Sequence, residues 1–448
     1  MKKICLVILA FWFTTPGYAL KEYYALSRSV RALGMGGAFY AMSDDARALF
    51  YNPAGLSFYT GEDQYMFSTN FQIAQGGVEA INQIREVTES TKDIGAIAAS
   101  IAALQGKPVY IGAGLFPFYL SKNKAIGLLL FDTKGQFGYL GKELDSSLDM
   151  TIISDSGIFM AYGKPVTENL HLGVTAKMIY RVGGRTAFSV IDLATSSTLS
   201  FDPQNLGGMG GGLDFDLGAT YELPTTWLPH WVKEGRLSLT ASNLIAGALI
   251  FKQSGTPPQL PRYVSFGSLF VLPGIASIDR FHVLFDLAEF GLGGQTDLDL
   301  GARGGSVWKK VNWGIEAPIK GWAFPRVGFH QGMFTLGLGL DFEFFKTDFA
   351  WYAEEVSSGI NRLASRRFAF TLTLGFAPPP PVTPLPPDKS GLKANLPSEA
   401  ATGETDSLLN LMEQSEPPTE AKDLSEGESP EPLPAQSKDD ASVEQKDR

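Results

Sequence analysis

The sequence predicts an all-β protein: a transmembrane antiparallel β-barrel of about 14 strands with an N-terminal hatch or plug and a disordered C-terminal tail. Three observations predict it: strands that alternate between apolar and polar residues, a secretory leader with no later membrane helix, and a last strand that ends in phenylalanine. A closed barrel pairs its backbone polar groups between strands, so it can cross a bilayer without helices. The expected organisation is a signal peptide at 1–19, a hatch at 20–62, the barrel at 63–376 and the tail at 377–448.

The alternation is clearest at residues 336–344 (LGLGLDFEF). Successive side chains of a strand point to opposite faces, so the Leu and Phe residues share one face, while Gly, Asp341 and Glu343 share the other. The same pattern recurs at 170–181, 213–222 and 281–287. Many strands of this kind are typical of a barrel with lipid outside and a polar lumen inside.

Fifteen ranges read as strands, and an odd number conflicts with the even counts of bacterial single-chain barrels. We therefore expect one range to be wrong, either 325–331 or a neighbour of the loop at 183–211. Residues 76–107 interrupt the series with apolar residues at helical spacing and predict a helical insertion. The predicted strands are 63–73, 108–119, 124–133, 149–163, 169–182, 212–223, 235–243, 261–272, 280–290, 296–304, 310–318, 325–331, 333–345, 347–355 and 366–376.

The N-terminal residues predict export. Lys2 and Lys3 precede an apolar run that closes on Gly17-Tyr18-Ala19, as in a secretory signal peptide. The one cysteine, Cys5, lies inside this leader, so we expect a mature chain without disulfides or thiolate metal sites. Together with the barrel pattern, the leader predicts a Gram-negative-type outer membrane as the location.

The other end differs in composition. The last strand ends at Phe376, which resembles the C-terminal signal by which barrel assembly machinery recognises outer-membrane barrels, and Pro378–Pro381 then stop the ladder. Residues 377–448 hold 15 acidic and six basic residues, a net charge of −9 against −10 for the whole chain. Such a Pro-rich acidic segment predicts a disordered periplasmic tail, with a periplasmic protein partner as the alternative and no nucleic acid as partner.

Two motifs before the first strand carry a family resemblance. Residues 31–39 (RALGMGGAF) and 44–56 (DDARALFYNPAGL) resemble the N-terminal hatch of FadL-like outer-membrane proteins, which are long-chain fatty-acid and hydrocarbon channels. The hatch also resembles that of PorV-like secretion barrels and TraF-like barrels. Residues 326–329, 351–355 and 366–376 resemble the last strands of the PorV-like and TraF-like groups. Outer-membrane lipid and a hydrophobic small molecule are the partners that the resemblance implies.

The hatch residues give the candidate site. The resemblance assigns Asn52, Pro53 and Ala54 to the periplasmic end of a ligand path, with Phe39, Phe50, Tyr51 and Leu56 as apolar candidates to line it. Gly34, Gly36 and Gly37 permit close backbone approach, and Ser43 is the expected N-cap of a helix over 43–49. Arg31, Asp44, Asp45 and Arg47 are expected to pair with lumen charges, from a set comprising Lys177, Arg181, Asp214, Asp216, Asp286, Asp299, Arg303, Glu316, Asp341 and Glu343.

Three functions stay open at this point. The first is passive transport of hydrophobic small molecules, such as fatty acids or hydrocarbons, without a cofactor. The second is a PorV-like structural or secretion-associated barrel that binds protein partners through loops or tail. The third is a lipid-modifying enzyme, for which His171 and His282 are the only sensible bases. No histidine lies in a metal-binding motif, so we expect no metal site and, with the first function ranked highest, no enzyme.

Overall fold

The structure is a computed structural model that describes residues 25–79, 82, 107–140, 147–189, 208–245, 249–255, 260–291, 307–342, 345–356 and 364–375. Its strands are β1 (Gln64–Ala74), β2 (Val109–Ser121), β3 (Lys124–Leu140), β4 (Ser147–Pro165), β5 (Leu170–Ser189), β6 (Gly208–Glu222), β7 (Glu234–Ser242), β8 (Leu249–Gly255), β9 (Tyr263–Pro273), β10 (Arg280–Gly291), β11 (Val311–Glu316), β12 (Ala323–His330), β13 (Met333–Asp341), β14 (Phe345–Glu355) and β15 (Ala364–Gly375).

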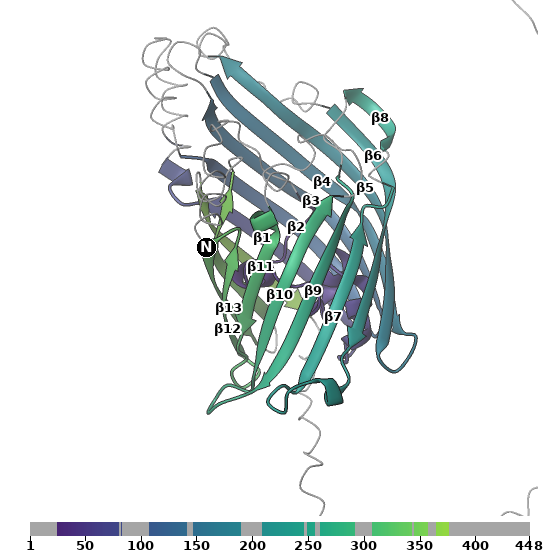
Figure 1. Ribbon diagram of the computed structural model, residues 1–448. Helices are drawn as coiled ribbons and strands as arrows, with labels where there is room; N and C mark the ends of the chain where they lie inside the picture. Colours follow the sequence, from purple (N-terminus) through teal and green to yellow (C-terminus); the bar gives the residue numbers. More distant parts are fainter. Residues whose placement is uncertain are drawn as a thin grey trace, which may run out of the picture. The chain divides into compact units, whose positions relative to one another are not determined.

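Fourteen of the described strands close into one antiparallel ring (Figure 1). Each strand pairs with the next along the chain, except that β7 pairs with β9, and β15 returns to pair with β1. The remaining strand, β8, lies outside the ring. It pairs with residues 208–212 of β6, whereas β7 pairs with residues 217–222 of the same strand. Strand β8 therefore extends β7 along β6 after an interruption in the pairing. The predicted fold class, a closed barrel of about 14 strands, is confirmed.

Most predicted strands coincide with observed ones, and the differences have physical causes. The doubtful range 325–331 is a true strand, β12, because Gln331 and Gly332, both at positive φ, make the two-residue turn that joins it to β13. Strand β8 was not predicted. The predicted strand 296–304 lies outside the described residues, and β10 pairs directly with β11, so the ring contains no strand between them.

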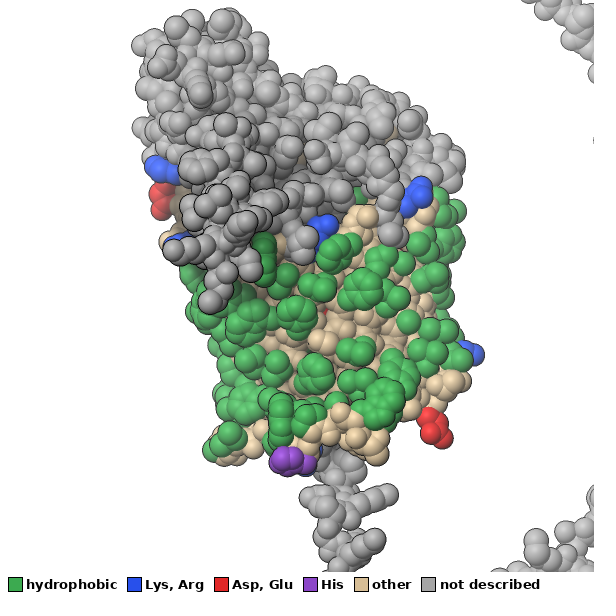
Figure 2. All heavy atoms as spheres, viewed as in Figure 1, with side chains coloured by type: hydrophobic (Ala, Val, Ile, Leu, Met, Phe, Trp, Pro, Cys, Tyr) green, Lys and Arg blue, Asp and Glu red, His purple; other side chains and the backbone are tan. Residues whose placement is uncertain are grey.

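The two faces of the wall differ in polarity as predicted. Along β5, Val174 and Met178 point outward and are 39% and 52% exposed, whereas Lys177 and Arg181 point inward and are buried. Figure 2 shows one outer face, over β7, β9 and β10, with hydrophobic side chains across its middle. Since apolar side chains cover the outside and charged ones the inside, hydrocarbon is the medium that suits the outer surface.

The connections differ in length at the two ends of the barrel. Most connections at one end are short, and β1 begins and β15 ends there; the other end carries most of the long connections. In barrels of this class the short turns face the periplasm. The short connections are 122–123, 166–169, 223–233, 274–279, 317–322 and 342–344, and the connections at the other end are 75–108, 141–146, 190–207, 243–262, 292–310, 331–332 and 356–363.

The segment before β1 holds three short helices, α2 (Val30–Gly34), η2 (Ala46–Leu49) and η3 (Pro53–Phe58). The expected helix over 43–49 is shorter, and its N-cap is Asp45, whose side chain accepts from the Arg47 backbone N–H. Ser43, the predicted cap, instead donates its hydroxyl to the Phe39 carbonyl at 2.8 Å. The cap prediction was wrong because Ser43 sits at the end of a turn that begins at Phe39.

Several predicted features lie outside the described residues: the signal peptide at 1–19, most of the helical insertion at 76–107, the terminal Phe376 and the tail at 377–448. In the described part of the chain, no helix is long and apolar enough to cross a membrane.

Candidate functional site

The N-terminal segment, residues 25–61, contacts inward-facing residues all around the ring. Its densest contact is with a row of three wall glycines, Gly163, Gly173 and Gly218, which lie side by side on β4, β5 and β6. A Cβ atom at any of the three would overlap with atoms of Asn52, Pro53 or Ala54. The row therefore admits the predicted Asn-Pro-Ala segment against the wall because it has no side chains there.

Asn52 uses its whole amide in this contact. The side chain is fully buried, its Oδ1 accepts from the Ala54 N–H at 3.1 Å, and its Nδ2 donates to the Tyr40 carbonyl and to Thr220 Oγ1, both at 2.9 Å. Pro53 follows at the first position of η3. Asn52 thus joins two turns of the segment to β6, and a buried amide with all these partners is costly to replace.

The three hatch glycines also contact the wall. The Cβ of a residue at Gly34 would lie 2.9 Å from Gly337 Cα on β13. Gly36 has φ +66° and packs against the Phe329 backbone, and a Cβ at Gly37 would lie 3.3 Å from His330 Nδ1. Two glycines of the wall, Gly314 and Gly328, receive Met35 in the same way. Small residues on both sides bring the two backbones together.

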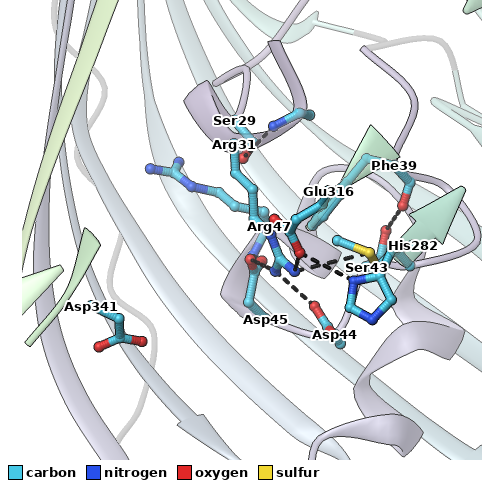
Figure 3. Close-up of polar contacts among 12 residues, drawn as sticks. Ser29, Arg31, Phe39, Ser43, Asp44, Asp45, Arg47, His282, Glu316 and Asp341 are labelled. Atoms are coloured by element: carbon cyan, nitrogen blue, oxygen red, sulfur yellow. Dashed lines mark hydrogen bonds and ion pairs between the residues drawn. The ribbon is translucent and has the colours of Figure 1, made fainter. Parts of the chain in front are cut away.

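Arg31 links the segment to a buried charge cluster (Figure 3). Its guanidinium donates to Glu316 at 2.9 and 3.0 Å, and Glu316 also accepts from Arg326 at 2.7 Å and lies 3.3 Å from His282 Nδ1. Glu316 is fully buried. Burial by itself would lower the pKa of Arg31, but the carboxylates of Glu316 and Asp44 raise it well above its ordinary value. The pair is therefore charged.

The other predicted pairings turn out differently. Asp44 and Asp45 bind Arg31 of their own segment at 2.9 and 3.1 Å, and Arg47 donates to the hydroxyls of Ser27 and Ser68. Asp341 binds Lys346. Within the wall Lys177 binds Asp216, and Arg181 binds Asp155, both at 2.6 Å. Asp299, Arg303 and Glu343 lie outside the described residues.

Asp286 does contact the segment, but through the backbone. One carboxylate oxygen accepts from the N–H groups of Phe39 and Tyr40 at 2.6 and 3.0 Å. The side chain is fully buried on the inner face of β10. Sequence reasoning expected a side-chain partner, and no local signal distinguishes a carboxylate that binds amides from one that binds a cation.

Apolar residues of the segment meet apolar residues that the wall turns inward, in two clusters. In the first, Leu49, Phe50 and Leu56 pack against the inner side chains of β2 to β5. The ring of Phe50 lies 5.1 Å from that of Phe116 and 4.8 Å from that of Phe159. The members of the wall in this cluster are Phe116, Leu120, Ala125, Leu129, Phe159, Ala161 and Ile179.

The second cluster lies against β9 and β10. Phe39 packs there with Leu269, Val271 and Leu284. Tyr51 joins the clusters: its ring is 5.2 Å from that of Phe39, and it packs partly buried against both groups. The four predicted apolar residues therefore form a nearly continuous apolar track beside an otherwise polar wall.

A cavity of about 40 Å³ lies beside this track. Phe50, Tyr51 and Gly37 line it, together with polar wall residues that include Lys177 and Asp216. Asn52, Pro53, Ala54, Phe39 and Leu56 do not line it, because they are packed against the wall. A cavity of this volume holds a few water molecules, so a solute as long as an acyl chain requires the segment to move.

His171 and His282, the bases considered for an enzyme, are both in contact with carboxylates. His171 Nδ1 lies 2.7 Å from Ser57 Oγ, and its Nε2 lies 3.0 Å from Glu222. Ser57 also donates its hydroxyl to the Ala54 carbonyl at 2.7 Å. Ser57 thus donates its hydroxyl proton within η3, and its contact with His171 links that helix to β5. Among the described residues, no group of three or more His, Cys, Asp or Glu is placed to hold a metal ion.

No protein-family model matches the chain, and no curated protein matches it by sequence. Solved structures do. The toluene transporter TbuX of Ralstonia pickettii has 12% identity, covers 81% of this chain and 100% of its own, and gives a TM-score of 0.43. The CymD monoaromatic hydrocarbon channel has 12% identity, coverages of 80% and 99%, and a TM-score of 0.42.

A FadL homologue of Pseudomonas aeruginosa has 10% identity, covers 80% of this chain and 99% of its own, and gives a TM-score of 0.29. These three neighbours are thus a toluene transporter, a monoaromatic hydrocarbon channel and a FadL homologue. All three TM-scores lie below 0.5.

Proposed function

We propose that the protein is an outer-membrane barrel for passive transport of hydrophobic small molecules, such as fatty acids or hydrocarbons, with its tail in the periplasm. The observation that supports this most directly is the apolar track inside the lumen. A barrel that passes only hydrophilic solutes has a polar interior. Here Phe116, Leu129, Phe159 and Ile179 point inward and meet the aromatic residues of the N-terminal segment.

The track offers a hydrophobic solute contacts that a polar wall does not. Each apolar side chain that a solute covers contributes on the order of 1 kcal/mol or more to binding. The polar anchors at Glu316 and Asp286 lie on β11 and β10, across the ring from the first apolar cluster. A shift of the segment at that cluster must break the Asn52–Thr220 and Ser57–His171 hydrogen bonds, but it leaves these two anchors in place. No energy source enters this scheme, because a solute moves down its own gradient.

The test replaces inward apolar residues by amides and measures two fluxes. In proteoliposomes, Phe159→Asn and Ile179→Asn should reduce the influx of a labelled fatty acid about tenfold, while the influx of a small sugar stays low. Thr371→Asn, on the inner face of β15 outside both clusters, is the matched control and should change neither flux. If the clusters only hold the segment in place, the same variants loosen it and both fluxes rise, which contradicts the proposal.

The PorV-like alternative predicts a protein partner that is lost when residues 377–448 are removed. No contact in the described part of the chain favours it over transport.

A further inference from the structure

Two parallel rows of apolar side chains cross five neighbouring strands on the outside of the barrel, from β13 through β14, β15 and β1 to β2, and all are large except Ala113 on β2. The first row follows the register of the sheet. Phe71 pairs with Ala113 on one side and Phe370 on the other, and Phe349 pairs with Phe370 and Leu338. Phe71 is 53% exposed, and the Phe349 and Phe370 rings lie 4.8 Å apart.

The second row lies two residues further along each strand. Ile73 pairs with Ile111 and Phe368, and Trp351 pairs with Phe368 and Leu336. Two residues of a strand span about 6.6 Å. The backbone positions of the two rows are therefore about 6.6 Å apart.

Small residues form the floor between the rows. Gly112, Gln72, Ala369, Ala350 and Gly337 are in register there; four of the five are small, and the Gln72 side chain points into the barrel. Ala350 and Ala369 pack on the inside against Val30 and Leu33 of the N-terminal segment. With no side chain rising between the rows, the outer surface is hollowed into an apolar groove of about 900 Å³.

Arg366 lies beside this groove, beyond the second row, on β15, which is the middle one of the five strands. It is exposed, lies two residues before Phe368 on β15, and places its guanidinium 5.9 Å from the centre of the Trp351 ring. Its neighbours across the sheet are Ala353 and Gln75, neither of which is acidic. It sits toward the end of the barrel with the long connections, where the outer leaflet of the bilayer begins.

We propose that the groove and Arg366 together bind one phosphorylated acyl lipid of the outer leaflet. A guanidinium matches a phosphate with two parallel hydrogen bonds. From Arg366 to the first row is four residues, or about 13 Å, close to the depth of one leaflet of the hydrocarbon core, about 15 Å. The phosphate binds Arg366, and the acyl chain runs from there past Trp351 and Phe368 into the groove.

The experiment measures lipid retention, so its outcome is independent of transport. The purified full-length mature protein, freed of lipid in detergent, is titrated with phosphatidylglycerol or with uncharged diacylglycerol and examined by native mass spectrometry. Arg366→Gln should weaken phosphatidylglycerol binding about fivefold and leave diacylglycerol binding unchanged.

Lys310→Gln is the matched control. The Lys310 ammonium also stands over an aromatic ring, 4.6 Å from the centre of Phe290, but no groove residue adjoins it. It should leave phosphatidylglycerol binding unchanged. Equal binding by wild type and Arg366→Gln, or an equal loss in Lys310→Gln, would overturn the proposal.

A second variant tests the groove itself. Phe368→Ala should weaken the binding of both lipids, because both place an acyl chain against that ring. If a variant does not fold, the wild-type protein still decides: its preference for phosphatidylglycerol over diacylglycerol must shrink as salt rises. A preference that does not respond to salt contradicts a phosphate on Arg366.

Discussion

The two sides of the lumen hold the N-terminal segment by different means. Toward β10–β12 the contacts are charged and directional, with Glu316 between two arginines and Asp286 on two amides. Toward β2–β6 close apolar packing around Phe50 and the row of wall glycines is joined by neutral hydrogen bonds from Asn52 and Ser57. The difference separates two tasks: buried charges fix one position, whereas apolar packing has no preferred direction and tolerates displacement.

The largest effect is expected at Glu316. Glu316→Gln leaves two buried guanidiniums, those of Arg31 and Arg326, without their shared carboxylate, and should destabilise the folded protein by about 4 kcal/mol. Urea titration of the refolded protein in lipid vesicles measures it. Glu222→Gln, at a carboxylate with a 40% exposed side chain, should cost less than about 1 kcal/mol. If the two variants lose similar amounts of unfolding free energy, the buried charge cluster at Glu316 does not hold the protein more strongly than an exposed carboxylate does.

A smaller effect is expected at the glycine row. Gly173→Val places a Cβ into the Pro53–Ala54 backbone and should cost about 2 kcal/mol, with faster proteolysis of the segment. Gly135→Val on the outer face of β3, where a Cβ meets only ordinary contacts at 3.5 Å, is the control. If proteolysis is unchanged in Gly173→Val, the row is not what holds the segment on this side.

The smallest effect on stability is expected at Asp63. This residue directly precedes β1, at the end of the barrel with the short connections, and belongs to neither side of the lumen. Hydrogen bonds from Ser121 and Tyr119 lower the pKa of this exposed carboxyl. The pKa of Asp63 is thus lower in the folded protein than in the unfolded chain. The stability that Asp63 contributes is fully present at pH values above its unfolded-state pKa, and it is lost as the pH falls through its folded-state pKa. Unfolding measured between pH 6 and 3 should therefore be less acid-sensitive in Asp63→Asn. If the acid dependence of unfolding is unchanged in Asp63→Asn, the Asp63 carboxylate does not stabilise the pairing of β1 with β2.

Sequence reasoning was most successful where the signal is local. A period of two residues identifies each strand and its outward face, as for Met178 and Lys177, because the pleat alone decides it. Strand β8 was missed because residues 243–248 separate it from the end of β7 and interrupt the pairing with β6. The doubtful β12 is short, and its place depends on pairing with β13.

The candidate site could be predicted only in part. The Asn-Pro-Ala segment is indeed against the wall, yet its partners Gly163, Gly173 and Gly218 are 109 or more residues away in the chain. Nothing in the local sequence marks those three among 49 glycines. Contacts between distant segments depend on the register of the whole ring, which no local pattern contains.

Asp286 has one further consequence. Its carboxylate holds main-chain N–H groups, so the identity of the side chains at positions 39 and 40 does not enter this bond. Nearly every amino acid would present the same two donors, and proline alone would remove one. Evolution could thus alter the aromatic residues at these positions without releasing this attachment.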